Sequence, residues 1–311
     1  MNQIDVIYNY YLYYSYMEIQ QLRALEAIAR AGSFLAAAEH LDVSQSSLSH
    51  AIAALERDLG ARLLDRGRNG AKPTDAGQRV LPYARQILAS LDAIRAETDT
   101  SAGLISGRVR VGSIPSAAVT FLPRVIAHLA HAHPNVEVVL LEEPSQSTQT
   151  IEEWLRTQMI DVALIQLPAT GTKTAALMSD ELCAILTASS PLAHRRQLSI
   201  RDLAAEPFIM SRYTSEPLLL AAYAHHGLTP RIRFEVQDRE TLISMVREGL
   251  GFSIVPRLAF SAALPGVTLV PVTPRIRREL GLAIRDGEHA SPALRAFLHS
   301  ASEVARKKRR R

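Results

Sequence analysis

Residues 44–59 read SQSSLSHAIAALERDL, and the two faces that this stretch would have as a helix differ in character. Four aliphatic residues recur at spacings of four, three and four: Leu48, Ile52, Leu55 and Leu59. On a helix with 3.6 residues per turn they share one stripe, which we expect to be buried. The spacing therefore predicts an amphipathic helix, which Ser44 would cap by accepting a hydrogen bond from an amide of the first turn.

The opposite face of this helix is small and polar. It is formed by Ser46, His50, Ala53 and Arg57, with Gln45 and Ser49 at its flanks. Gln and Ser side chains can read base edges in the major groove of DNA, and the start of a helix can meet a phosphate. Taken alone, the stretch fits an ordinary amphipathic surface helix equally well, so its neighbours in the chain must decide between the two interpretations.

Two short helices are predicted immediately before it. Residues 18–31 carry an apolar stripe that ends at Gly32, and Ser33 is the expected cap of a second helix over 34–41. Asp42 and Val43 leave room only for a tight turn. Two short helices, a turn and a polar-faced second helix are typical of a helix-turn-helix.

A basic hairpin follows the three helices. The stretch ARLLDRGRNGAKPT contains Arg62, Arg66, Arg68 and Lys72 around the Asn69-Gly70 pair. Asn-Gly is a strong hairpin-turn signal, and basic side chains on a hairpin tip can reach phosphates or the minor groove. This segment is therefore predicted to be the wing of a winged helix-turn-helix.

A long helix is predicted over residues 75–100. Its apolar residues Val80, Ala84, Ile87, Leu91 and Ile94 follow the spacing of a coiled-coil seam, and Pro82 is expected to bend its early part. Such a seam has little to bury against within its own chain, which indicates a partner subunit. The alternative is that the helix packs onto the C-terminal half of the same chain.

From Gly107 onward, strands alternate with helices. Apolar strand patterns occur at 108–113, 136–141, 161–165, 182–187, 207–210, 252–256, 268–272 and 279–284, and helices are expected at 121–131, 148–158 and 292–305. This alternation predicts mostly parallel sheets, whose ligands bind beyond the carboxyl ends of the strands. Hydroxyl groups and backbone amides in the loops at those ends would suit a small molecule with a carboxylate or similar anion. Any one serine taken singly is better explained as a helix cap.

Composition excludes several classes of protein. The chain has 311 residues, 47% of them hydrophobic, and no apolar run near the roughly 20 residues that span a bilayer. Residues 1–16 lack the features of a secretory signal and are expected to be a disordered extension. The six basic residues 306–311 account for the positive net charge, since removing them changes it from +4 to −2. One cysteine, Cys183, rules out an intrachain disulfide and fits a cytoplasmic protein.

Residues 18–97 resemble the DNA-binding region of LysR-type transcriptional regulators. The resemblance rests on QLRALEAIARAGSFLAAAEHLDVSQSSLSHAIAALERDLGARLLDR at 21–66, on KPTDAG at 72–77, and on the long helix. It implies a double-stranded promoter operator as ligand, RNA polymerase as a further partner, and a homodimer or tetramer formed through residues 75–100. The side chains expected to contact DNA are Ser33, Ser44, Gln45, Ser46, Ser49, His50, Arg57, Arg66, Arg68 and Lys72. His50 stands where this family usually has Arg, which puts the family's usual base contact in doubt.

The C-terminal half is similar to the family's effector domain, which resembles a periplasmic binding protein with two α/β lobes. REGLGFSIVP at 247–256 is the best-matched segment, whereas LRTQMIDVALI lacks a glycine that the family often has. The resemblance implies an effector domain over 107–305, with lobe I at about 107–167 and 272–305, and lobe II at about 168–271. The chain would cross between the lobes near 166–168 and near 271–273. The residues expected to bind the effector are Ser113, Ser116, Ser145, Ser147, Gln166, Ser211 and Tyr213.

The sequence thus predicts an α/β protein with a winged helix-turn-helix at 17–74, a linker helix, a two-lobed effector domain and a basic tail. Neither a catalytic set nor a cofactor motif is found, and His128, His131 and His133 lack the company of further metal ligands. We therefore expect no enzyme activity, cofactor or metal. Two alternatives stay open: a solute-binding or enzymatic α/β protein whose N-terminal helices serve assembly, and a non-specific DNA binder driven by its tail.

Overall fold

The computed structural model describes residues 17–67, 70–100, 105–141, 148–211, 215–260, 264–285 and 290–309. The predicted N-terminal extension and the end of the basic tail lie outside these ranges. The chain divides into two compact units, residues 1–95 with 157–159 and residues 96–156 with 160–311. Among the described residues, no helix is long and apolar enough to cross a membrane.

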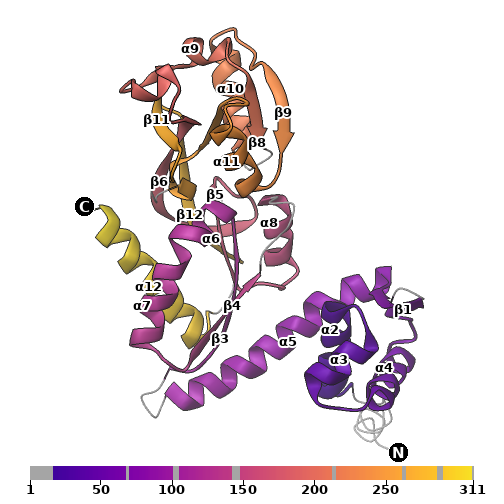
Figure 1. Ribbon diagram of the computed structural model, residues 1–311. Helices are drawn as coiled ribbons and strands as arrows, with labels where there is room; N and C mark the ends of the chain where they lie inside the picture. Colours follow the sequence, from indigo (N-terminus) through magenta and orange to yellow (C-terminus); the bar gives the residue numbers. More distant parts are fainter. Residues whose placement is uncertain are drawn as a thin grey trace, which may run out of the picture. The chain divides into compact units, whose positions relative to one another are not determined.

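The first unit begins with three helices, α2 (Ile19–Ala31), α3 (Phe34–Leu41) and α4 (Gln45–Leu59), shown in indigo in Figure 1. Gly32 ends α2 in the left-handed conformation, and Ser33 caps α3 by accepting a hydrogen bond from the amide of Ala36. Leu48, Ile52 and Leu55 of α4 enter the core of this unit, whereas Leu59 is 42% exposed. The predicted stripe is therefore one residue too long, because α4 ends at Gly60 before a further turn can cover Leu59.

The wing is an antiparallel pair of strands, β1 (Leu64–Gly67) and β2 (Gly70–Pro73). Its return strand packs onto the turn between α2 and α3, where the amide of Ala71 donates to the carbonyl of Gly32 at 2.7 Å. Gly70 has a φ of +109°, and a Cβ atom there would lie 2.2 Å from the same carbonyl oxygen. Only glycine fits this contact, so Gly70 allows the wing to approach the turn between α2 and α3 this closely.

Replacing Gly70 by alanine should therefore displace the wing. We expect a loss of about 1–3 kcal/mol in the stability of this unit, the range for strained backbone positions, together with weaker DNA binding. Thermal unfolding and titration of duplex DNA would measure the two effects. Gly67→Ala is the matched control, because a Cβ at Gly67 meets nothing within 4 Å; equal behaviour of the two variants would contradict the contact.

The linker helix α5 (Asp75–Thr100) runs through Pro82 over the range that the sequence predicts. Its predicted seam is divided between two environments. Ala84 is buried and Val80 partly buried in the core of the first unit itself, whereas Ile87 is 39% and Ile94 63% exposed. Of the later seam residues, Ile87 and Ile94 are thus exposed, and Leu91 is half-buried.

The second unit has two lobes, each with its own hydrophobic core. Lobe I carries three parallel strands in the order β4 (Val136–Leu141), β3 (Gly107–Ser113) and β5 (Val162–Leu167). Its helices are α6 (Pro115–Thr120), α7 (Leu122–Ala132), α8 (Thr148–Arg156) and α12 (Pro292–Arg309). Figure 1 shows α12, from the end of the chain, beside α7, so that lobe I is built from both ends of this domain.

Lobe II contains the strands β7 (Leu198–Ser199), β8 (Phe208–Ser211), β9 (Ile232–Val236), β10 (Ser253–Pro256) and β11 (Val267–Thr273). Its helical segments are η1 (Pro191–His194), α9 (Ile200–Ala204), α10 (Glu216–His225), α11 (Arg239–Arg247) and η2 (Arg257–Phe260). Phe208 lies at the centre of the lobe, with its ring 5.0 Å from that of Phe252 and 6.5 Å from that of Tyr223.

Two long strands join the lobes, β6 (Thr172–Thr187) and β12 (Arg277–Arg285). Residues 172–181 of β6 pair with β12 in lobe I, and residues 182–187 pair with β10 and β11 in lobe II. The first crossing therefore falls near Asp180, and the expected crossing near 166–168 is wrong because one continuous strand serves both lobes. The second crossing lies between β11 and β12, close to the expected 271–273.

The pairing of these two strands also corrects the expected sheet. Strand β12 runs antiparallel to both β5 and β6, and β6 runs antiparallel to β10 and β11. This eight-stranded sheet is thus mixed. Its parallel pairs are β4–β3, β3–β5 and β11–β7. Strand β12 brings the chain back to lobe I, in the direction opposite to that of β6, which leaves lobe I. The two strands are therefore antiparallel, and the sheet is not mostly parallel as expected.

Candidate functional sites

The start of α4 presents a short polar surface. Ser44 caps the helix by accepting from the amide of Ser47 at 3.1 Å, and its Oγ also lies 2.8 Å from that of Ser46 and 2.7 Å from that of Ser47. Gln45 and Ser46 are exposed. The hydroxyl of Ser44 is therefore occupied by capping, while the side chain of Gln45 has room to reach a base edge.

The exposed face of α4 has no exposed acidic side chain between His50 and Arg57. His50, Ala53 and Arg57 are exposed and Ser49 is half-buried. The carboxylate of Glu56 accepts from the amides of Leu63 and Leu64 at 2.7 and 3.2 Å, which ties it to the start of the wing. This surface can therefore approach a polyanion without a repelling carboxylate at its centre.

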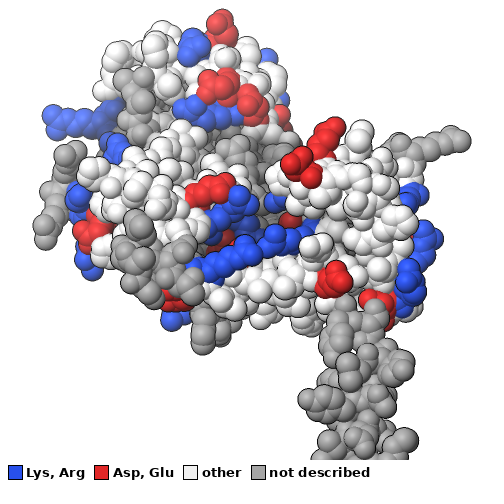
Figure 2. Space-filling model, turned by 90° about the horizontal axis from the view of Figure 1, so that it is seen from below, with Lys and Arg blue, Asp and Glu red and all other residues white. Residues whose placement is uncertain are grey.

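The wing adds further exposed basic groups to this unit. Arg66 lies over the ring of Phe34 at 4.2 Å, a cation–π contact that holds its guanidinium in one place, and Lys72 is exposed. Ser33 serves as the cap of α3, and Arg68 lies outside the described residues. Figure 2 shows basic side chains gathered at the outer edge of this unit, on the side where Figure 1 places α4 and β1.

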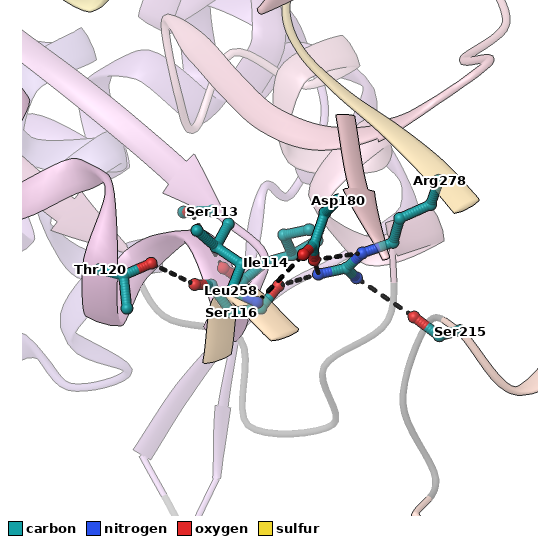
Figure 3. Close-up of polar contacts among 8 residues, drawn as sticks. All are labelled: Ser113, Ile114, Ser116, Thr120, Asp180, Ser215, Leu258 and Arg278. Atoms are coloured by element: carbon teal, nitrogen blue, oxygen red, sulfur yellow. Dashed lines mark hydrogen bonds and ion pairs between the residues drawn. The ribbon is translucent and has the colours of Figure 1, made fainter. Parts of the chain in front are cut away.

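In the effector domain, four buried polar side chains meet where the lobes join, and we call them the interlobe cluster: Ser116, Asp180, Ser215 and Arg278 (Figure 3). They come from α6, from the two crossing strands and from the residue before α10. Arg278 is only 3% exposed. Burial lowers the pKa of Arg278 from its ordinary value, and the Asp180 carboxylate opposes that shift.

Hydrogen bonds connect all members of the interlobe cluster. Arg278 donates from Nε and Nη2 to Oδ2 of Asp180 at 3.0 and 2.7 Å, from Nη2 to Ser116 at 2.7 Å, and from Nη1 to Ser215 at 3.1 Å. The other oxygen of Asp180 accepts from the amide of Leu258 at 3.0 Å. One guanidinium therefore bridges a serine of lobe I and a serine of lobe II (Figure 3).

Two of the residues expected to bind an effector share a sheet face with Arg278. Ser113 ends β3, and Gln166 is the next-to-last residue of the neighbouring parallel strand β5. Ser113 pairs with Leu164, and Gln166 with Leu280, two residues from Arg278. Paired residues and residues two apart point to the same face. The sequence-predicted Ser113, Ser116 and Gln166 thus gather near the interlobe cluster.

Ser211 ends β8 in lobe II and is buried, and its Oγ has no hydrogen-bond partner among the described residues. The same holds for Oε1 of Gln166. Ser145, Ser147 and Tyr213 lie outside the described residues, so their expected roles stay predictions. A buried polar atom without a partner costs free energy, so a ligand that supplied the missing hydrogen bond would be favoured at either atom.

Sequence reasoning missed Asp180, Ser215 and Arg278. The signal for two of them was present, because LMSDELCAILT and RRELGLAI each carry charged residues directly before an apolar run. A charge in such a strand must be paired if it is buried. What the sequence alone does not reveal is that the two charges face each other across the β6–β12 pairing.

A winged helix-turn-helix, a long helix and a two-lobed α/β domain together define a class of effector-responsive DNA-binding regulators. Two family models match this chain: "Bacterial regulatory helix-turn-helix protein, lysR family" at residues 19–78 and "LysR substrate binding domain" at residues 102–306. The chain belongs to the LysR family of transcriptional regulators. It is a DNA-binding regulator with an effector-binding domain, not an enzyme, and the predicted family and fold class are confirmed.

Individual relatives agree over nearly the whole length. A probable HTH-type transcriptional regulator, LrrA of Synechococcus elongatus, is 36% identical over 92% of this chain and 97% of its own. The structure of full-length OxyR from Pseudomonas aeruginosa, a point variant, superposes with a TM-score of 0.73 at 22% identity, over 92% of this chain and 98% of that one. CbnR in complex with its target DNA gives 0.65 at 23% identity, over 92% and 99%.

Proposed function

We propose that this chain binds a palindromic promoter operator as a dimer or tetramer, with α4 in the major groove and the wing against the backbone. The observation that carries the proposal is the exposed, polar face of α4 in the same unit as the exposed basic residues of the wing, Arg66 and Lys72. The exposed part of the α5 seam, Ile87 and Ile94, supports pairing of subunits through this helix. RNA polymerase as a partner and a cytoplasmic location stay predictions from the sequence.

We further infer that a small molecule bound where the lobes meet sets the outcome at the promoter. Such a ligand can shift DNA binding only by its difference in affinity for two arrangements of the protein. The interlobe cluster supports this site, because its hydrogen bonds join both lobes through one side chain and would respond to any change in their separation. Ser113, Gln166 and Ser211 are the proposed contacts.

A thiol-based response is disfavoured by the chemistry of the one cysteine. Cys183 lies within β6 and is buried, and this burial raises its pKa to about 11. The thiolate is the reactive form of cysteine, so this side chain is held in the unreactive one. With a single cysteine in the chain, no intrachain disulfide can form either. The chemistry of this thiol therefore gives no support to a thiol-based response.

A gel-shift with the intergenic DNA upstream of the protein's own gene tests the proposal. We expect a retarded complex at moderate salt that unlabelled operator, but not scrambled duplex, competes away. A variant lacking residues 306–311 should bind the operator equally well, whereas a tail-driven DNA binder would lose its binding. Absence of retardation with the intact chain would contradict the operator-binding proposal.

His50→Ala should weaken operator binding by about tenfold while changing non-specific binding less than twofold, since a base contact is worth about 1–3 kcal/mol. Titrations of operator and scrambled duplex at several salt concentrations would measure this. Lys72→Ala serves as the matched control, because loss of a phosphate contact weakens both complexes and lowers the salt slope by about 1. An equal loss on both duplexes for His50→Ala would contradict base readout.

A further inference from the structure

Both oxygens of the Asp180 carboxylate accept hydrogen bonds from groups that could equally bind another anion. Two guanidinium N–H groups of Arg278 hold Oδ2, and the backbone amide of Leu258 holds Oδ1. Hydrogen bonds between a guanidinium and a carboxylate are charge-assisted, and they are stronger than those between neutral groups. We call these donors the anion socket.

The guanidinium of the anion socket is fixed before any ligand arrives. Ser116 and Ser215 accept two further hydrogen bonds from Arg278, so that four bonds in all engage this side chain, which has five N–H donors. Its burial excludes water from the socket. The positive charge is therefore preorganised for one anion, and Asp180 supplies that anion from within the chain.

We propose that the anion socket is closed to external anions by Asp180, so that a ligand of this junction is recognised through uncharged hydrogen-bonding groups. This inference rests on the proposed effector site. Two buried atoms without a partner are a hydroxyl and an amide oxygen, which suit a ligand bearing hydroxyl or amide groups. They are Oε1 of Gln166, on the sheet face of Arg278, and Oγ of Ser211, at the end of β8 in lobe II. Such a ligand replaces the anionic effector that the sequence suggests.

Two physical reasons favour the internal carboxylate over a dissolved one. A free anion must give up translational and rotational freedom on binding, whereas Asp180 loses that freedom when the chain folds. Displacing Asp180 would also leave its charge buried without a partner, which is strongly unfavourable. An anion in the millimolar range therefore cannot compete, unless Asp180 is removed.

Chemical rescue tests the socket directly. In the full chain, Asp180→Ala should open it, and 50 mM sodium acetate should then raise the melting temperature by about 3 °C over sodium chloride of equal ionic strength, as expected for a ligand about tenfold above its Kd. The wild type should melt at the same temperature in both salts. Acetamide, the uncharged analogue, should leave Asp180→Ala unchanged.

Two control variants sharpen the result. Asp180→Asn keeps the socket physically filled and should show no response to acetate. Glu137→Ala removes a carboxylate from the exposed ion pair with Arg108 and should show none either. A stabilisation of the wild type by acetate as large as that of Asp180→Ala would overturn the proposal, as would the same response in Glu137→Ala.

A further variant covers the case in which Asp180→Ala does not fold. Asp180→Ala/Arg278→Met removes the guanidinium together with its carboxylate; it should fold and should not respond to acetate, and an acetate response in it would place the anion elsewhere and overturn the socket. These measurements involve no DNA. If the acetate test gave the expected result but the gel-shift showed no retarded complex, only the proposed function would therefore be contradicted.

Discussion

Arg278→Met should lower the stability of the effector domain by about 3–5 kcal/mol, the cost of breaking a buried ion pair by removing one partner. Methionine fills much of the same volume, so lost packing contributes little. What remains is a carboxylate, Asp180, that is almost fully buried and keeps only the amide of Leu258 as a hydrogen-bond donor among the described contacts. Ser116 and Ser215 lose their shared donor at the same time.

A second substitution tests whether the lost stability comes from the unpaired charge of Asp180 or from altered packing. Arg278→Met/Asp180→Leu should recover most of the lost stability, because replacing both members of a buried pair by apolar groups is often neutral. Urea unfolding followed by the fluorescence of Trp154, the single tryptophan and a residue of α8, would report on this domain. Arg156→Met breaks an exposed ion pair with Glu153 and should cost at most about 1 kcal/mol; a comparable cost for Arg278→Met would contradict the role given to burial.

The DNA-binding unit could be predicted almost residue by residue, because its signals are local. Gly32, Ser33 and Ser44 end or cap helices within a few residues of the apolar stripes that they delimit. The wing could be predicted from Asn69-Gly70, but its attachment could not. The contact between Gly70 and Gly32 joins residues on either side of two helices, and nothing near either glycine in the sequence reveals it.

The interlobe cluster could be predicted only in part. Ser113, Ser116 and Gln166 follow or lie near the ends of strands whose pattern is plain in the sequence, and the rule that ligands bind beyond such strands led to them. Asp180 and Arg278 are 98 residues apart and meet because of the register between β6 and β12. A charged residue in a predicted strand is normally expected to face solvent. Only the register between β6 and β12 shows that Asp180 and Arg278 are buried together.

Leu55→Ala should cost the DNA-binding unit about 2–5 kcal/mol and abolish operator binding, whereas Leu59→Ala should change either by little. The two leucines lie four residues apart on the same predicted stripe of α4. Leu55 is fully buried among the side chains of α2 and α3, but Leu59 lies in the last position of the helix and is 42% exposed. Removing Leu55 leaves a cavity under the surface that we propose contacts DNA, whereas removing Leu59 leaves none.

Amide hydrogen exchange of α2 and α4 would measure the local stability of this unit, with Trp154 fluorescence confirming that the effector domain of each variant stays folded. In Leu55→Ala we expect faster exchange in both helices, because α4 loses its contact with α2 and the two open together. Leu59→Ala should speed exchange only near Gly60, where the helix ends in any case. If both variants bound the operator like the wild type, the affinity could not depend on how firmly α4 is held, and the phosphate contacts of the wing would have to supply it.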